Sequence, residues 1–457
     1  MSAVEPMRVG VIGAGYVGLV TAACLAELGH DVTCIDTDAA KVARLKAGEM
    51  PIYEPGLEAL VGANGARGRL RFATDIAEAA EAGIDVLFIA VGTPTDSSGG
   101  GVNLAYVHAA VEQAACALAR QSGGFTVVVT KSTVPVGTSR KVAEILGRHL
   151  SHERFAVASN PEFLREGSAI ADFMQPDRIV VGSQSARARA ILDELYSPLV
   201  RAGRPMVVTS AVETAELVKY AANAFLATKI TFINELARLC EATGADITEL
   251  ARGLGLDDRI GAKFLAAGPG FGGSCFPKDL LALIKTGTDY GSPVEIVETV
   301  IRANDRHKQL MVRKIRTALG GTLQNRRIGV LGLSFKAETD DMRNAPALTI
   351  VPQLIAEGAD VNAYDPAASA TAREHLPQLS LAASVEAAVT GADAVVILTE
   401  WSVFRSIDWR KLGPMMRRPL VIDLRNIYEP DAMVRQGMDY LPLGRQEAEP
   451  PFRAAAE

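Results

Sequence analysis

The sequence predicts an α/β protein in which two doubly wound parallel sheets are joined by a long central helix and a helical region. A short apolar strand at Arg8–Ile12 runs into a glycine-rich turn and an Ala/Leu-rich helix. A strand of similar pattern begins at Arg327, and the stretch 213–241 between them holds neither glycine nor proline. Because 457 residues are too many for one core, we expect three parts, at 1–205, 206–318 and 319–457.

Charge and hydropathy exclude two classes of partner. The net charge is −6 and no long run has a single sign, so non-specific binding of nucleic acid is not expected. Residues 1–8 lack the basic and apolar regions of a signal peptide, and apolar runs such as 86–91 are much shorter than a membrane span. We therefore expect a cytoplasmic protein that contacts no membrane.

The five cysteines are an odd number, lie far apart and include no C-x-x-C pair. Neither a disulfide framework nor a metal site is predicted from them. Four have the apolar neighbours of small core residues: Cys24, Cys34, Cys116 and Cys240. Cys275 alone lies among glycines and polar residues.

The first strand leads into a G-x-G-x-x-G motif at Gly13, Gly15 and Gly18, with a helix after it and Asp36 at the end of the next strand. Gly13 permits the tight turn, Gly15 lets the backbone approach a pyrophosphate, and Gly18 lets the helix pack on the strand. Asp36 would accept hydrogen bonds from an adenosine ribose and repel a 2′-phosphate, so a Rossmann-like domain that prefers NAD to NADP is predicted. The alternative is that the glycines only shape a turn.

Further strands follow at α/β spacing, at 85–91 and 126–130, and they precede Thr93 and Thr133. Ligands of such sheets bind at the carboxyl ends of strands. Each threonine is therefore a candidate ligand contact, with a helix N-cap as the alternative.

The next strand, 156–159, leads into the polar turn 160–167. Its two acids, Glu162 and Glu166, are four residues apart. They face the same way if this turn opens a helix.

The stretch 213–241 is predicted to be one long helix, too apolar and Ala-rich to be solvated on all sides. It should be buried between domains or against a second subunit. Lys219 and Asn223 stand one turn apart on it. They form either an ordinary solvated surface or the wall of a polar pocket.

The segment 272–279, Gly-Gly-Ser-Cys-Phe-Pro-Lys-Asp, is too rich in glycine and proline for an ordinary helix or strand. Lys278 and a helix that begins near Asp279 would lower the pKa of the Cys275 thiol and make it a nucleophile. The alternative is a buried cysteine in a tight loop.

The C-terminal part repeats the N-terminal pattern, as an ancient duplication would explain: 327–330 matches 8–11, 361–365 matches 32–36, and 393–398 matches 85–90. The copy replaces the glycine motif by Ser334-Phe335-Lys336. Because lysine binds phosphate as a point charge, this half is expected to hold a different nucleotide. Only 447–457 looks like a loose tail.

Taken in order, these motifs resemble the UDP-glucose/GDP-mannose dehydrogenase family. The resemblance covers about Arg8 to Tyr440 and rests on the glycine motif, 131–135, 161–167, Lys219 with Asn223, the cysteine segment, Phe335-Lys336 and 340–343. The Cys-Phe-Pro-Lys-Asp-Leu form of the cysteine segment is most similar to the UDP-glucose branch. One departure is Leu424, beside Arg425, where relatives commonly carry glycine.

The resemblance implies two successive NAD-dependent oxidations at C6 of UDP-glucose, giving UDP-glucuronate without release of the aldehyde. Cys275 would add to the aldehyde as a thiohemiacetal, and water would hydrolyse the thioester that follows. Lys219 would stabilise alkoxide charge at C6. Asn223 and Asp279 would orient it and a water.

The same resemblance implies further roles. Glu166 would be the base for thioester hydrolysis, with Glu162 and Thr133 as proton-relay or water-positioning groups. NAD would contact Gly13, Gly15, Tyr16, Val17, Gly18, Asp36, Lys41, Thr93, Thr133, Glu166, Lys278 and Arg343. The sugar nucleotide would contact Glu162, Phe163, Leu164, Arg165, Glu166, Lys219, Asn223, Phe264, Leu265, Ala266, Ala267, Gly268, Gly272, Lys336 and Arg425. Arg259 would reach the substrate of a neighbouring subunit, so a functional homodimer or larger homo-oligomer is expected.

Two alternatives stay open. The same chemistry could act on GDP-mannose or a UDP-N-acetylhexosamine, because the sequence does not say how the pocket reads the base or the C2 substituent. The second alternative is a non-catalytic NAD-binding scaffold or a two-electron dehydrogenase. The presence of Lys219, Cys275 and Asp279 together argues against it. Polysaccharide biosynthesis is the family's usual use of the product.

Overall fold

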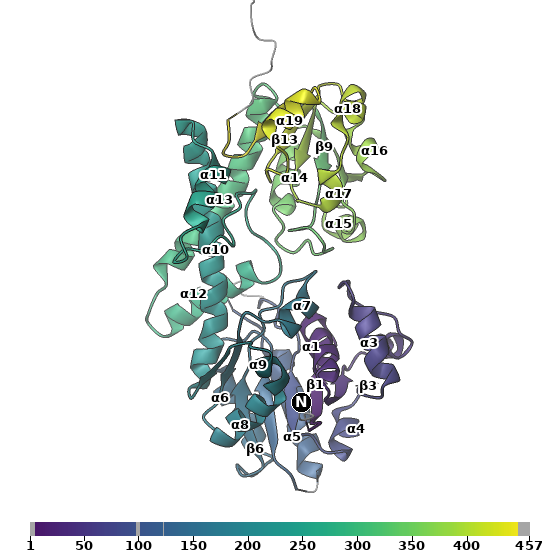
Figure 1. Cartoon of the computed structure of the whole chain (residues 1–457), viewed down its shortest axis with the longest axis vertical. Coiled ribbons are helices and arrows are strands. Elements are labelled where there is room, and N and C mark those ends of the chain that lie inside the picture. Colours follow the sequence, from purple (N-terminus) through teal and green to yellow (C-terminus); the bar gives the residue numbers. More distant parts are fainter. Residues whose placement is uncertain (1–4, 97–100, 122, 447–457) are drawn as a thin grey trace, which may run out of the picture. The chain divides into compact units, whose positions relative to one another are not determined.

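A computed structural model of the protein describes residues 5–96, 101–121 and 123–446. The chain folds into two compact units, Met1–Ala222 with Leu281–Pro293, and Asn223–Leu280 with Val294–Glu457. Each unit contains one β-sheet with helices packed on it (Figure 1). The expected division into three parts stays a prediction, and the predicted tail at 447–457 lies outside the described residues.

Within the described residues, the first unit contains an eight-stranded sheet in the order β3-β2-β1-β4-β5-β6-β7-β8. Neighbouring strands are parallel, except that β6 and β7 pair antiparallel. The strands are β1 (Arg8–Ile12), β2 (Asp31–Ile35), β3 (Leu70–Ala73), β4 (Val86–Ile89), β5 (Thr126–Thr130), β6 (Phe155–Ser159), β7 (Ile179–Gly182) and β8 (Met206–Thr209). The helices are α1 (Tyr16–Glu27), α2 (Ala39–Lys46), α3 (Leu57–Ala66), α4 (Ile76–Glu81), α5 (Ala105–Arg120), α6 (Thr138–Gly147), α7 (Ala169–Met174), α8 (Ala186–Leu195) and α9 (Ser197–Arg201).

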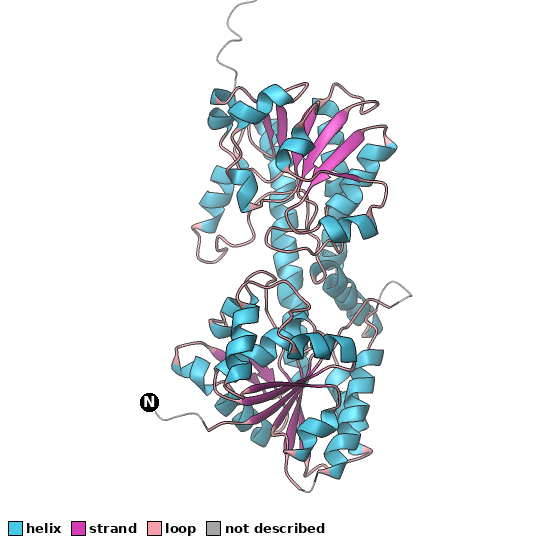
Figure 2. Ribbon diagram, turned by 90° about the vertical axis from the view of Figure 1, so that its right-hand side faces the viewer, coloured by secondary structure: helices cyan, strands magenta, loops and turns pink. Residues whose placement is uncertain are grey.

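Both faces of this sheet are covered by helices, as Figure 2 also shows. Val86 and Phe88 of β4 pack in one cluster with α1, α3, α7 and α8. The alternate residues Leu87 and Ile89 pack in a second cluster with α4, α5 and α6. Two buried faces explain why β4 and β5 read as unbroken apolar runs instead of alternating patterns.

The second unit contains a six-stranded, fully parallel sheet in the order β11-β10-β9-β12-β13-β14 within the described residues. The strands are β9 (Arg327–Leu331), β10 (Asp360–Tyr364), β11 (Ser380–Leu381), β12 (Ala394–Ile397), β13 (Leu420–Asp423) and β14 (Asp439–Pro442). The helices are α11 (Ile247–Gly255), α13 (Glu295–Ala318), α14 (Ala347–Ala356), α15 (Ser369–His375), α16 (Val385–Val389), α17 (Ser402–Arg405), α18 (Trp409–Leu412) and α19 (Pro430–Arg435), with a 3-10 turn η1 (Gly413–Met415).

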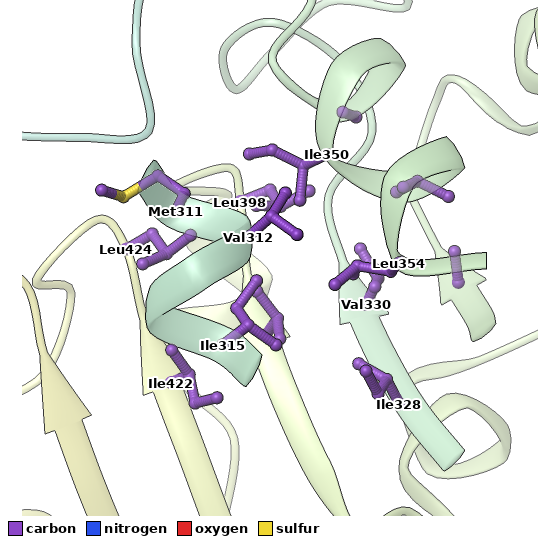
Figure 3. Packing of buried hydrophobic residues seen from close by; sticks show 14 of the residues in the cluster. Met311, Val312, Ile315, Ile328, Val330, Ile350, Leu354, Leu398, Ile422 and Leu424 are labelled. Atoms are coloured by element: carbon purple, nitrogen blue, oxygen red, sulfur yellow. The ribbon is translucent and has the colours of Figure 1, made fainter. Parts of the chain in front are cut away.

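One long helix of this unit packs its apolar stripe on the sheet. Met311, Val312 and Ile315 of α13 lie in one buried cluster with β9 and β13 residues such as Val330 and Ile422 (Figure 3). The i, i+1, i+4 spacing puts these three side chains on one face of α13. The apolar side chains from strand and helix therefore form a single core.

Two helices contribute to both units, α10 (Val212–Thr243) and α12 (Phe276–Asp289). The predicted long central helix is thus confirmed as α10, and the predicted pair of doubly wound α/β domains is confirmed as well. In the part of the chain that the structure describes, no helix is long and apolar enough to cross a membrane. The described residues also contain no group of three or more His, Cys, Asp or Glu arranged for a metal ion.

Candidate active site

Five loops of the first unit lie at one edge of its sheet, because the parallel strands β1, β2, β4, β5 and β6 all end there. Lys41 lies nearby on α2. Tyr16, Val17 and Gly18 form the first turn of α1. The predicted contacts in the loops themselves are Gly13, Gly15, Asp36, Thr93, Thr133, Glu162, Phe163, Leu164, Arg165 and Glu166.

The glycine turn after β1 has the geometry of a pyrophosphate cradle. Gly13 has a φ of 105°, and a Cβ there would lie 2.6 Å from the carbonyl oxygen of Ala90. A Cβ on Gly18 would lie 1.8 Å from the carbonyl oxygen of Gly13, so α1 can pack on the turn only without a side chain. Nothing lies within 4 Å of a Cβ placed on Gly15. Open backbone at the positive end of a helix fits a diphosphate.

Asp36 presents an ionised carboxylate at the end of β2. It accepts hydrogen bonds from the amides of Ala14 at 2.8 Å and Asp38 at 3.0 Å and from Nζ of Lys41 at 2.9 Å. Burial raises the pKa of Asp36, but these three donors outweigh burial and hold the pKa below its usual value. Such an acid suits the ribose diol of NAD.

A cavity of about 440 Å³ lies at the carboxyl ends of β1 and β2. Ile12 and Ile35, the last residues of these strands, line it together with Thr37 and Thr74. Half of its lining residues are apolar and half are polar or charged, a mixture that can hold a nucleoside. The glycine turn, Asp36 and this cavity together fit NAD.

The first unit also contains a buried ion pair. Nζ of Lys219 on α10 lies 2.9 Å from Oε1 of Glu162, and both side chains are almost fully buried. The amide of Leu164 donates to Oε2 of Glu162 at 2.6 Å. Burial raises the pKa of Glu162, whereas Lys219, the Leu164 amide and Lys131 lower it, and the net result is a lowered pKa. The predicted catalytic lysine is therefore held against an ionised carboxylate.

Lys131 was not among the predicted site residues, yet it is a second buried cation. Its Nζ donates to Oδ1 of Asn160 at 2.9 Å and lies 5.7 Å from the ring centre of Phe173. Burial lowers the pKa of Lys131 to about 8. A lysine directly after an apolar strand is common at a sheet edge, so its position in the sequence gave no signal of burial.

The turn after β6 does not open a helix, because α7 begins only at Ala169. Glu162 and Glu166 therefore do not lie on one helical face. Glu162 is buried, whereas Glu166 is half-buried. Arg165 turns its guanidinium to Asp172 of α7, with Nη2 and Oδ1 2.5 Å apart. This ion pair uses Nε and Nη2 of Arg165, and the predicted contact with a sugar nucleotide stays a prediction.

Cys275 of the second unit lies at the N-terminus of α12. Its carbonyl accepts the amide of Asp279 at 2.9 Å, and Oγ of Ser274 lies 3.5 Å from its Sγ. The residue is exposed. The predicted alternative of a buried cysteine is therefore wrong, and the positive end of α12 is placed to stabilise a thiolate.

Asp279 joins two predicted catalytic or binding residues of the same unit. Its buried carboxylate accepts Nδ2 of Asn223 at 2.7 Å through Oδ2 and Nζ of Lys278 at 2.8 Å through Oδ1. Both oxygens are thus engaged. These contacts fix the first turn of α12, directly after Cys275.

Two glycines let the cysteine segment lie against the loop after β9. A Cβ on Gly272 would lie 2.3 Å from the carbonyl oxygen of Asn344, and one on Gly273 would lie 2.9 Å from the ring of Phe335. The amide of Gly273 donates to the carbonyl of Arg343 at 2.8 Å. The structure thereby brings the predicted contacts Gly272, Lys336 and Arg343 into one region.

Arg425 extends this region. It follows β13, donates from Nη2 to the carbonyl of Phe335 at 3.1 Å, and would lie 2.9 Å from a Cβ on Gly268. The neighbouring Leu424 is fully buried in the core. Gly268, the last residue of the predicted segment 264–268, therefore lies beside the guanidinium of Arg425.

The acid that corresponds to Asp36 in the duplicated half has a different role. Asp365 is buried, and its carboxylate accepts the amides of Leu333 at 2.7 Å and Ser334 at 3.0 Å. Its Oδ1 also accepts the amides of Ala367 at 2.9 Å and Ala368 at 2.8 Å, so both oxygens of this buried carboxylate are engaged by the protein. A nucleotide in this half must be held by other groups, in line with the prediction for Lys336.

Three polar residues that were not predicted clamp the segment before Cys275. Asn304 of α13 accepts the amide of Phe271 at 2.9 Å and donates to its carbonyl at 3.2 Å. Oδ1 of Asn234 accepts the amide of Gly268 at 2.9 Å, and Nε2 of His307 donates to the Gly268 carbonyl at 2.8 Å. Burial lowers the pKa of His307 to about 4, so the imidazole is neutral at pH 7. In the sequence these three residues are recognisable only as polar positions within the apolar pattern of the helices α10 and α13.

For three predicted contacts of the second unit, the structure does not test the predicted ligand. Lys278 and Arg343 were expected to bind NAD, and Arg259 to reach a neighbouring subunit. The Arg259 side chain is 89 % exposed and pairs with Asp257, with Nη2 and Oδ2 2.6 Å apart. These roles stay predictions.

Comparison with known proteins decides the family. Residues 7–200 match the NAD binding domain of the UDP-glucose/GDP-mannose dehydrogenase family, residues 213–306 its central domain, and residues 329–430 its UDP binding domain. The chain belongs to this family. The predicted resemblance is thus confirmed, and the cofactor of this UDP-glucose/GDP-mannose dehydrogenase family member is NAD.

Similar proteins cover the chain almost completely. The UDP-glucose 6-dehydrogenase of Rhizobium meliloti (strain 1021) is 51 % identical over 443 residues, which are 96 % of this chain and 100 % of that protein. The structure of a UDP-glucose dehydrogenase from Pyrobaculum islandicum has a TM-score of 0.89 at 38 % identity and covers 98 % of this chain and 99 % of its own. The UDP-D-ManNAc dehydrogenase of Pyrococcus horikoshii has a TM-score of 0.82 at 28 % identity, with 97 % and 100 % covered.

Proposed function

We propose that this family member oxidises UDP-glucose to UDP-glucuronate in two NAD-dependent steps through a covalent adduct on Cys275. The observation that carries the proposal is the exposed thiol at the N-terminus of α12, beside the Asp279, Asn223 and Lys278 contacts. The similarity to enzymes named UDP-glucose 6-dehydrogenase supports this substrate over GDP-mannose or an N-acetylated sugar. A non-catalytic scaffold would need none of these groups.

Bound at the glycine turn, NAD supplies a hydride acceptor. The chain's own residues handle the other parts of the reaction. The C6 alcohol first loses a proton from its oxygen and a hydride from its carbon to NAD, which gives the aldehyde. The Cys275 thiolate then attacks C6 of the aldehyde, and the oxygen at C6 takes a proton to give a thiohemiacetal. Loss of a hydride and a proton from that adduct leaves a thioester. Water then adds at C6, and the C–S bond breaks to give the carboxylate and the free thiol.

Lys219 is proposed to stabilise the negative charge that develops on the oxygen at C6. Its pairing with Glu162 supports this role, because an ionised carboxylate keeps the ammonium charged and fixes its position. Asn223 and Asp279 orient the attacking group. Glu166 serves as the base for thioester hydrolysis, and Thr133 positions water.

The nucleotide part of the substrate is proposed to lie in the second unit. Lys336 and Arg425 supply positive charge for the diphosphate. Residues 264–268 and Gly272 offer backbone groups at close range. The match of 329–430 to the UDP binding domain supports this assignment.

We further propose that the chain forms a homodimer through α10. Phe225, Phe232 and Leu239 follow each other at seven-residue spacing and are 66 %, 51 % and 56 % exposed, an apolar stripe that suits a second helix. Arg259 would then reach the substrate of the partner copy. Phe232→Asp is expected to give a monomer in analytical ultracentrifugation, because burying a carboxylate in that stripe is costly. An unchanged dimer would exclude this face.

A cytoplasmic location is proposed as well, since all five cysteines are free thiols, as is typical of a reducing compartment. Cell fractionation that recovers the protein elsewhere would contradict it.

The decisive experiment counts NADH formed per UDP-glucose consumed, with sugar limiting and NAD in excess. Two NADH per sugar, with UDP-glucuronate as the product, is the expected result. One NADH with free aldehyde would exclude the thioester pathway. Turnover of GDP-mannose in place of UDP-glucose, in a direct competition, would contradict the substrate.

A further inference from the structure

Glu54 connects two loops of the first unit that act on different ligands in the proposed function. It lies just before α3, is buried, and was not among the predicted site residues. Its Oε2 accepts the hydroxyl of Tyr16 and the amide of Gly167, the latter at 2.7 Å, and its Oε1 accepts the amide of Ala169 at 2.8 Å. The Tyr16 hydroxyl also accepts the Gly167 amide at 3.2 Å. One carboxylate therefore holds both segments.

The two segments belong to different parts of the site. Tyr16 is the first residue of α1, whose N-terminus the glycine turn leaves open for a diphosphate. Gly167 directly follows Glu166 and closes the turn that also carries Glu162. A displacement of either segment must therefore strain the contacts of Glu54 to the other.

The contacts are strong enough to transmit such a displacement. Burial and the neighbouring Glu54 raise the pKa of Tyr16, so its hydroxyl keeps its proton and donates. The carboxyl group of Glu54 accepts three donors, two of them backbone amides at 2.7 and 2.8 Å. Leu57 and Ala169, on either side of this link, lie in the same fully buried cluster as the residues of α1, and a close-packed interior transmits strain.

We propose that Glu54 is a positioning residue that couples NAD binding at α1 to sugar-nucleotide binding at the turn 162–167, so that each ligand strengthens the binding of the other. The inference rests on the proposed function, because it takes the turn to be part of the substrate site. Linkage requires the coupling to be reciprocal. Nothing in the glycine motif or in the segment around Glu54 predicts this link.

The test titrates NAD with and without saturating UDP-glucuronate, which is already oxidised and so binds without turnover. In the wild-type protein UDP-glucuronate is expected to tighten NAD binding severalfold. Tyr16→Phe removes only the link to α1, since Glu54 keeps its bonds to Gly167 and Ala169. The coupling factor should then fall close to one while the melting temperature stays nearly unchanged.

Glu54→Gln should abolish the coupling too. It should also weaken NAD binding in the absence of UDP-glucuronate about tenfold, because an amide cannot accept all three donors. The coupling factor of the double variant should equal that of each single variant, because both substitutions remove the same link. Asp393→Asn is the matched control: Asp393 is also buried and accepts the Arg327 amide at 2.8 Å, so its loss should lower the melting temperature alone.

Coupling of wild-type size in Tyr16→Phe, or no coupling in the wild-type protein, would overturn the inference. If Glu54→Gln does not fold, Tyr16→Phe decides by itself. Failure of the proposed function has a separate signature, the absence of UDP-glucuronate binding or of UDP-glucose oxidation by the wild-type protein. In that case an unchanged NAD affinity in Glu54→Gln would still overturn the role of Glu54.

Discussion

Cys275→Ala is expected to lower the steady-state rate of UDP-glucuronate formation by ~10⁴-fold or more, because no other group of the segment can form the thiohemiacetal and thioester. NAD affinity should be unchanged, since Gly13, Gly15 and Asp36 lie in the first unit. The measurements are acid formation by chromatography and NAD titration of the same sample.

Cys240→Ala is the matched control for this variant. Cys240 lies in the buried core of the same unit, so its replacement should reduce stability slightly and leave acid formation intact. Retention of acid formation in Cys275→Ala would exclude covalent catalysis there. Loss of NAD affinity in Cys275→Ala would instead assign the cysteine segment a structural role.

Lys219→Met is expected to lower kcat by about 10²- to 10³-fold, the usual effect of removing one group aimed at developing charge. It should also destabilise the protein by about 3–5 kcal/mol at pH 7, because Glu162 is left buried without its partner. Thermal unfolding and steady-state kinetics measure the two effects separately. Lys314→Met, which breaks an ion pair with Glu241 whose side chains are 15 % and 32 % exposed, is the control and should leave kcat unchanged.

The stability loss in Lys219→Met should depend on pH. In the wild-type protein the pKa of Glu162 lies below its usual value of 4.5, so its stabilising contribution is present above about pH 4.5 and is lost as the pH falls through the lowered pKa. Without Lys219 this pKa rises. The difference in melting temperature between the two proteins should therefore narrow from pH 7 toward pH 4.

A second variant separates stability from catalysis at this pair. Lys219→Met combined with Glu162→Gln removes both charges and should regain most of the lost stability but none of the activity. Recovery of activity in this double variant would contradict the proposed role of Lys219.

The parts of the site that lie within one short segment were readable from the sequence. Gly13, Gly18 and Asp36 follow from one strand-turn-helix-strand unit, in which the chain itself brings the residues together. The neighbours of the cysteines were a less reliable guide: Cys24, Cys34 and Cys240 are buried as predicted, but Cys116, which was also predicted to be a core residue, is exposed like Cys275. Whether the turn 160–167 opens a helix was left open by the sequence, and the structure shows that α7 begins only after this turn and that Arg165 pairs with Asp172.

By itself, the sequence determined the fold class and the cofactor motif, because strand and helix periodicity and glycine spacing are local properties of the chain. The family followed from the resemblance of its ordered motifs to those of known members. Only the tertiary structure decided which polar side chains are buried and what they contact: Lys219 against Glu162, Asn304 on Phe271, and Glu54 between Tyr16 and Gly167. The free energy of a buried polar group depends on partners that packing brings from distant segments. Spacing along the chain carries no record of those partners.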